Sequence, residues 1–247
     1  MFGYIVTGVV RESAYHLAPV AVKELHLRSS SSVCADFAHE VLMNVYLHDH
    51  PNVPNCIGGC LEPESLFLVM QLMEGSLEDK LLTEGLYAEL SARPLVLEML
   101  LEACSAVHHL HQKRIIHRDI AARNFLTDRG RKVYISDFGL SLYLPEGKSC
   151  DHVAPFGAPA WMAPEALQNG EFSVQTDVYA FGMMLVEVFG RGYPFPDELS
   201  AEEVKQMVLA GRRPDLNPSW PDSLVSLIKD CWQQNPTKRP NNMMEVF

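Results

Sequence analysis

The feature that most constrains this chain is a cluster of charged and polar residues enclosed by apolar ones. It runs from Ile115 to Leu126 and contains His117-Arg118-Asp119, followed after four residues by Asn124. A second carboxylate follows in Asp137-Phe138-Gly139. A lone aspartate in a loop is usually solvated or forms a turn. Asp119 instead lies between apolar segments, beside an arginine and close to a carboxamide, which predicts a site built from oxygen ligands.

These two blocks, H-R-D-(four residues)-N and D-F-G, resemble the catalytic motifs of eukaryotic protein kinases. The resemblance covers nearly the whole chain and implies an α+β, bilobal protein-kinase-like fold. That fold has a small lobe with an antiparallel sheet and a larger, mainly helical lobe. Residues 1–247 then form one kinase domain, with a partial small lobe at 1–73, a hinge at about 71–74 and a large lobe at 74–247. The residues that carry the resemblance are, in order, Lys23, Glu40, Asp119, Asn124, Asp137, Glu165, Asp177 and Arg239.

The spacing of apolar residues predicts the main elements. Alternation predicts strands at 4–10, 19–25, 53–60 and 65–72, and a serine run predicts a loop at 28–33. Helical spacing predicts helices at 36–47, from about 74, at 91–112, at 174–190 and from Ser200 to Gly211. The 174–190 helix is apolar almost all round, which is typical of a buried helix. Ser200-Ala201-Glu202-Glu203 has the pattern of a capping box.

The resemblance assigns a phosphate contact to a lysine in a strand, and the partner of that lysine to the helix that follows. It implies that Lys23 holds the α- and β-phosphates of ATP and pairs with Glu40. An ordinary surface lysine is the alternative for Lys23, but an inward-facing Glu40 needs a cation. Asn44 stands where the family usually has an apolar residue, so we expect a weaker active placement of this helix.

Phosphoryl transfer to a hydroxyl needs a carboxylate to orient that hydroxyl and metal to neutralise the phosphates. The resemblance implies the first role for Asp119, and Mg²⁺ binding for the oxygens of Asn124 and Asp137. Arg123 is expected near the transferred phosphate, because Ala121 replaces the lysine of many Ser/Thr kinases.

The resemblance also implies an adenine pocket. Met70 is expected at its back, Gln71, Leu72 and Met73 form the hinge, and Leu126 closes the pocket from below. The expected ATP contacts are Gly3, Ile5, Ala21, Lys23, Glu40, Met70, Gln71, Met73, Leu126 and Asp137.

Residues 137–165 resemble an activation segment. Its hydroxyls could take phosphate and pair with Arg118, although an unmodified loop hydroxyl is the alternative for each. The expected regulatory residues are Arg118, Phe138, Gly139, Ser141, Tyr143 and Ser149. Asp177 is expected to bind the backbone of the catalytic loop, and Arg239 to pair with Glu165. His108, His109 and His111 suggest a metal site or, as the preferred interpretation, cations at a helix C-terminus.

Bulk properties restrict the partners. A net charge of −11 argues against nucleic acid or an anionic membrane, and no apolar run reaches the roughly 18 residues that span a bilayer. We see no signal peptide, and the six scattered cysteines fit reduced thiols in a cytoplasmic protein. The expected partner is a protein substrate with a Tyr, Ser or Thr hydroxyl. The oligomeric state stays undefined.

Both ends depart from the family. Residues 2–8 resemble only the end of the glycine-rich phosphate loop and the following strand, so a first strand and half of that loop are expected to be missing. The chain is also expected to stop within the last helix of the family. We therefore expect weak ATP binding and low stability. The alternatives to a kinase are a pseudokinase scaffold and an ATP-binding switch that depends on a partner. Ala121-Ala122-Arg123 resembles tyrosine kinases, whereas Gly157-x-Pro159-x-Trp161 resembles the tyrosine-kinase-like group, so tyrosine is favoured only slightly.

Overall fold

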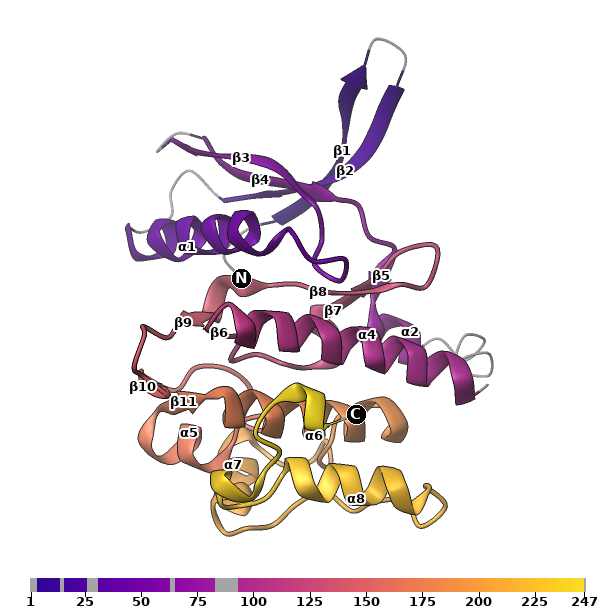
Figure 1. Ribbon diagram of the computed structural model, residues 1–247, viewed down its shortest axis with the longest axis vertical. Helices are drawn as coiled ribbons and strands as arrows, with labels where there is room; N and C mark the ends of the chain where they lie inside the picture. The colour runs from indigo at the N-terminus through magenta and orange to yellow at the C-terminus, as the bar shows by residue number, and fades with distance from the viewer. Residues whose placement is uncertain (1–3, 14–15, 26–30, 63–64, 83–92, 247) are drawn as a thin grey trace.

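The protein has a small lobe with a β-sheet and one helix above a larger lobe made mainly of helices (Figure 1). The computed structural model describes residues 4–13, 16–25, 31–62, 65–82 and 93–246. The small lobe contains β1 (Tyr4–Ser13), β2 (His16–Glu24), α1 (Ser31–Leu47), β3 (Cys56–Glu62) and β4 (Ser65–Gln71). This is the α+β, two-lobed architecture predicted from the sequence.

The sheet of the small lobe has the antiparallel order β1-β2-β4-β3. Its register places Ala21 opposite Met70 and Lys23 opposite Leu68. Residues two apart in a strand share a face, so Ala21 and Lys23 lie on the same side of the sheet. Helix α1 lies between this sheet and the large lobe (Figure 1), where Phe37 and Val41 pack against Leu68 in a small apolar core.

Three predicted boundaries differ from the structure. Helix α1 begins at Ser31, so the loop predicted at 28–33 is wrong from that residue on. Serine is well tolerated at helix starts, where its hydroxyl can accept a backbone N–H bond. The third strand is displaced to 56–62 because Pro54 lies in the predicted start. Helix α2 begins at Leu77, after the two-residue strand β5.

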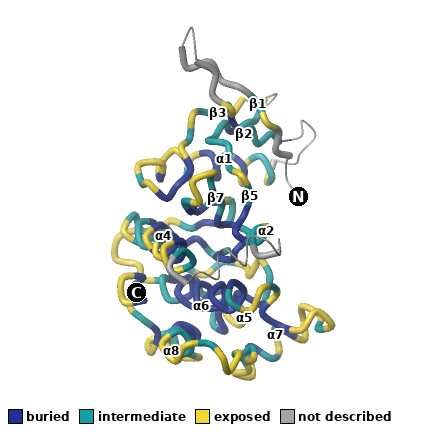
Figure 2. The backbone as a smooth tube through the Cα atoms, turned by 90° about the vertical axis from the view of Figure 1, so that its right-hand side faces the viewer, coloured by how far each residue is buried: buried dark blue, intermediate teal, exposed yellow. Residues whose placement is uncertain are grey.

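The larger lobe is organised around α6, which is buried along almost its whole length (Figure 2). Its interior includes Phe181 and Met184, each without exposed surface. Burying a side chain of this size contributes about 1.5–3 kcal/mol. Within the described residues, the α-helices of this lobe are α2 (Leu77–Leu82), α4 (Arg93–Gln112), α5 (Pro164–Asn169), α6 (Val174–Gly190), α7 (Ala201–Leu209) and α8 (Asp222–Cys231).

Short strands attach the predicted activation segment to this lobe. Strand β9 pairs with β6, and β10 pairs with β11, both antiparallel. The short strands are β5 (Gly75–Ser76), β6 (Ile115–Ile116), β7 (Phe125–Thr127), β8 (Val133–Ile135), β9 (Leu142–Tyr143), β10 (Cys150–His152) and β11 (Glu171–Ser173). The segment is therefore fixed near its start, by β9, and at its middle, by β10.

Two predicted structural motifs are confirmed. The Arg239 guanidinium, which has no exposed surface, donates to both Glu165 oxygens at 2.6 and 2.9 Å. The capping box begins α7, where the Ser200 hydroxyl accepts from the Glu203 N–H, and Gly211 follows the helix with φ +80°. None of the helices in the described ranges is both long and apolar enough to cross a membrane.

Candidate active site

The two lobes meet at a lysine placed between two carboxylates. Lys23 Nζ lies 2.5 Å from Glu40 Oε1 and 3.7 Å from Asp137 Oδ1. The predicted Lys23–Glu40 pair is thus confirmed. Burial raises the pKa of Glu40, and the Asp137 charge adds to this, while Lys23 acts in the opposite direction. Asn44 is also buried and donates to the Glu40 carbonyl at 2.9 Å, without displacing the Glu40 side chain from Lys23.

Asp119 is held by two donors from its own loop. Arg123 contacts one carboxylate oxygen, and the Asn124 amide donates to the other at 2.8 Å. The Asn124 amide also donates to the Asp119 carbonyl at 2.7 Å. The Asp119 side chain is 16% exposed, so it is positioned by the protein and still reached by solvent. The structure therefore brings together Asp119, Arg123 and Asn124, as the motif predicted.

The loop that carries Asp119 is fixed from below by a buried carboxylate on α6. Asp177 accepts the His117 N–H at 2.8 Å and the Arg118 N–H at 3.0 Å. Its Oδ2 also lies 2.9 Å from His111 Nε2. Arg118 has φ +69°, a left-handed conformation that costs about 1–2 kcal/mol outside glycine and that these bonds offset. The predicted backbone contact of Asp177 is confirmed.

The second motif turns sharply beside the lysine. Asp137 has φ +63°, and its carboxylate is 53% exposed, while Phe138 is fully buried with its ring edge-on to His117 at 5.7 Å. A Cβ at Gly139 would lie 3.6 Å from Asp137 Oδ1 and 3.7 Å from Glu40 Oε2. The segment thus packs beside Glu40 of α1 with ordinary van der Waals spacing at Gly139.

The predicted adenine contacts lie around the connection between the lobes. Met70 and Gln71 end β4, Leu126 lies in β7 opposite Ser76, and the Gln71 N–H donates to the Asn55 carbonyl at 2.9 Å. Ile5 pairs with Lys23 in the sheet, but its side chain and the whole of Gly3 lie outside the described residues.

The predicted regulatory hydroxyls have different surroundings. Ser141 is 4% exposed and donates to the Phe138 carbonyl at 2.7 Å, so the prediction that it takes phosphate is not supported in this conformation. Tyr143 is 49% exposed, and Ser149 is also exposed. Arg118 donates to the carbonyls of Leu140 and Ala154, both in the activation segment. Burial lowers the pKa of Arg118, and Asp177 partly opposes this.

One residue of this region was not predicted. Glu187 on α6 is buried and accepts from the Ala122 N–H and from Trp161 Nε1, each at 2.9 Å. Burial raises the pKa of Glu187 to about 7. The sequence signal was a carboxylate within a helix that is apolar almost all round, since a buried carboxylate requires partners. The histidines fit neither alternative fully, because His111 binds Asp177, and the described residues contain no group of three or more potential metal-binding His, Cys, Asp or Glu side chains.

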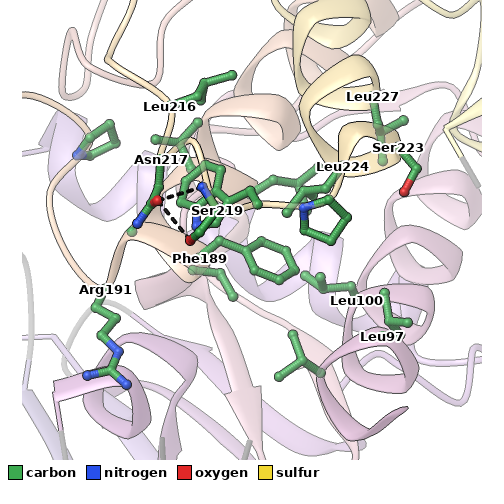
Figure 3. A pocket seen from close by; sticks show the side chains of 18 of the residues that line it. Leu97, Leu100, Phe189, Arg191, Leu216, Asn217, Ser219, Ser223, Leu224 and Leu227 are labelled. Carbon is green, nitrogen blue, oxygen red and sulfur yellow. Dashed lines mark hydrogen bonds between the residues drawn. The ribbon is translucent and has the colours of Figure 1, made fainter. Parts of the chain in front are cut away.

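A separate cavity lies in the larger lobe (Figure 3). It measures about 1240 Å³ and is lined mainly by apolar side chains, including Leu100, Phe189 and Leu224 from α4, α6 and α8. None of the residues predicted for ATP or for catalysis lines it. It is therefore distinct from the site formed around Lys23 and Asp119.

Comparisons with known proteins agree with this geometry. A family model described as protein tyrosine and serine/threonine kinase matches residues 1–246. The chain is 31% identical over 237 residues to a probable serine/threonine-protein kinase of Dictyostelium discoideum, covering 95% of this chain and 25% of that protein. It is 34% identical over 243 residues to the dual specificity protein kinase shkA of the same organism, covering 95% and 45%.

A viral relative is similar to this chain over a stretch of nearly the same length. The tyrosine-protein kinase transforming protein Fps of avian sarcoma virus (strain PRCII) is 30% identical over 242 residues, covering 97% of this chain and 44% of that protein. The chain thus spans less than half the length of these three relatives. The motifs, the fold and the family match lead to one conclusion: this chain belongs to the protein tyrosine and serine/threonine kinase family.

Proposed function

We propose that this domain transfers the γ-phosphate of ATP to a protein hydroxyl. The observation that carries the proposal is the joint arrangement of Lys23 between Glu40 and Asp137, with Asp119 fixed by Asn124 in the adjacent loop. Lys23 would hold the α- and β-phosphates, and Glu40 would keep its ammonium group in place. Asp119 would orient the substrate hydroxyl and accept its proton.

The donor set also fits a magnesium ion. Mg²⁺ prefers oxygen ligands and uses few of them from the protein, and Asp137 presents a carboxylate that is 53% exposed beside Lys23. Asn124 donates from its amide nitrogen to Asp119, so its amide oxygen is the atom that would hold the ion. When bound, the ion would neutralise charge on the phosphates. Arg123 adds a positive charge next to Asp119.

We propose tyrosine as the favoured acceptor, with Ser and Thr as the alternatives. The support is Arg123, which the sequence Ala121-Ala122-Arg123 places beside Asp119, as it would be in a tyrosine-kinase loop. The named relatives include tyrosine, serine/threonine and dual specificity kinases, so they support the reaction more than the acceptor.

The test is Mg²⁺-dependent transfer of labelled γ-phosphate to the protein itself and to peptides that contain either Tyr or Ser/Thr. We expect Asp119→Asn to lower the rate at least about 100-fold, whereas the exposed Asp230→Asn should match the wild type. Phosphoamino-acid analysis of the product identifies the acceptor. Equal rates in Asp119→Asn and wild type would contradict the assigned role.

A nucleotide-binding module without turnover is the second candidate. It is favoured by the fact that both Asp119 oxygens already accept hydrogen bonds from Arg123 and Asn124. In that case ATP with Mg²⁺ would raise the melting temperature of the wild type, and no labelled product would form. Label transfer that depends on Asp119 would exclude this candidate.

A further inference from the structure

One buried carboxylate joins two separate parts of the proposed active site. Glu187 is 2% exposed, and a single oxygen, Oε2, accepts both the Ala122 N–H and the Trp161 indole N–H at 2.9 Å. Ala122 belongs to the catalytic loop, and Trp161 to the end of the activation segment. Both segments are therefore attached to the same point of α6.

The indole ring extends this connection to the catalytic residues. The Arg123 guanidinium carbon lies 4.8 Å from the centre of the Trp161 ring, a cation–π contact. Tyr193 packs edge-on against the same ring at 5.2 Å and 82°. Glu187 and Tyr193 thus fix the ring, the ring supports Arg123, and Arg123 contacts the Asp119 carboxylate.

We propose that Glu187 and Trp161 are positioning residues that hold Arg123 against Asp119. They couple the end of the activation segment to the catalytic loop. This inference rests on the proposed phosphoryl transfer, because Asp119 has its role in that reaction. Neither Glu187 nor Trp161 touches Asp119 in the described contacts, so both act through Arg123 and the backbone of Ala122. Lys23 and Glu40 belong to a different part of the site, so the contacts to ATP should not depend on this connection.

Kinetic variants separate positioning from nucleotide binding. Trp161→Phe keeps an aromatic face for Arg123 but removes the indole N–H. We expect kcat to fall about tenfold, the size of losing one hydrogen bond, with little change in the KM for ATP. Glu187→Leu should show a similar loss, and Glu187→Gln, which keeps an acceptor oxygen, should recover most of the rate. Trp220→Phe is the matched control, because Trp220 packs against Phe189 away from this site.

A structural readout tests the same idea without turnover. Hydrogen exchange of the amides in residues 119–124 should be faster in Trp161→Phe than in wild type, and unchanged in Trp220→Phe. A wild type that transfers no phosphate would refute the proposed function, while the exchange experiment would still decide the positioning role. Unchanged exchange in Trp161→Phe would overturn the inference, and so would a kcat equal to that of the control.

Discussion

Replacing Asp177 by asparagine tests whether one buried carboxylate holds the catalytic loop. Asp177 has no exposed surface, and its two oxygens receive the backbone N–H groups of His117 and Arg118. Asparagine is almost the same size but carries an NH₂ group in place of one oxygen. In either orientation this NH₂ would face a backbone N–H, which leaves a buried donor without an acceptor.

The expected loss follows from these contacts. One hydrogen bond to a charged acceptor is worth about 1.5–3 kcal/mol, and an unsatisfied buried donor costs about 1–3 kcal/mol. The left-handed backbone of Arg118 adds a strain that the remaining bond offsets less well. We expect the free energy of unfolding to fall by about 3–5 kcal/mol. Each kcal/mol lowers the melting temperature by about 2–4 °C in a chain of this size, which gives about 6–20 °C.

Scanning calorimetry of wild type, Asp177→Asn and Asp230→Asn provides the measurement. Asp230 is exposed on α8, so its substitution should change stability by no more than about 0.5 kcal/mol. A melting temperature of Asp177→Asn within about 2 °C of this control would refute the reasoning. It would show that the loop keeps its conformation without the carboxylate.

Three further predictions concern other buried groups. Arg239→Leu should lower the free energy of unfolding by about 3–5 kcal/mol in urea, because Glu165 loses its buried partner. The double variant with Glu165→Leu should recover part of this loss, and no recovery would argue against the pair. Burial raises the pKa of Glu187 from 4.5 to about 7, with Glu78 adding to the shift and Ala122, Trp161 and Arg123 opposing it. The stability from this group is complete below about pH 4.5 and falls by about 3 kcal/mol as the pH rises through 7. The variant Glu187→Gln should lack this fall in stability. Thermal melts in which wild type and Glu187→Gln lose stability in parallel as the pH rises would contradict the prediction. Finally, mass spectrometry of the autophosphorylated protein should find no phosphate on Ser141, because this side chain is buried. Phosphate on Ser141 would show that the activation segment opens.

The motif residues could be predicted because their partners are close in sequence or are implied by the family resemblance. Asp119 and Asn124 belong to one loop, and Lys23 is the cation that an inward Glu40 requires. The contact between Glu187 and Trp161 joins segments that only the tertiary fold brings together. No periodicity of the sequence encodes this contact, so Glu187 was not assigned a role from the sequence.

The histidines near the end of α4 also have partners that the sequence does not predict. Their position near the end of α4 predicted placement by the helix dipole, but the side of the helix decides their partners. His111 faces α6 and binds Asp177, whereas His109 stacks on His50 with ring centres 4.5 Å apart. Burial lowers the pKa of His109, and the Asp49 carboxylate, 3.2 Å from its Nε2, acts in the opposite direction.

The two strand pairs that attach the activation segment decide where its length can change. Between β9 and β10 the chain makes a turn whose carbonyls at Leu144, Pro145 and Lys148 are bound by Arg114. An inserted residue after Glu146 would enlarge that exposed turn and leave both pairs in register. An insertion after Phe156 would instead shift Trp161 relative to the ring contacts with Arg123 and Tyr193. Variation in length should therefore be tolerated before β10 and selected against after it.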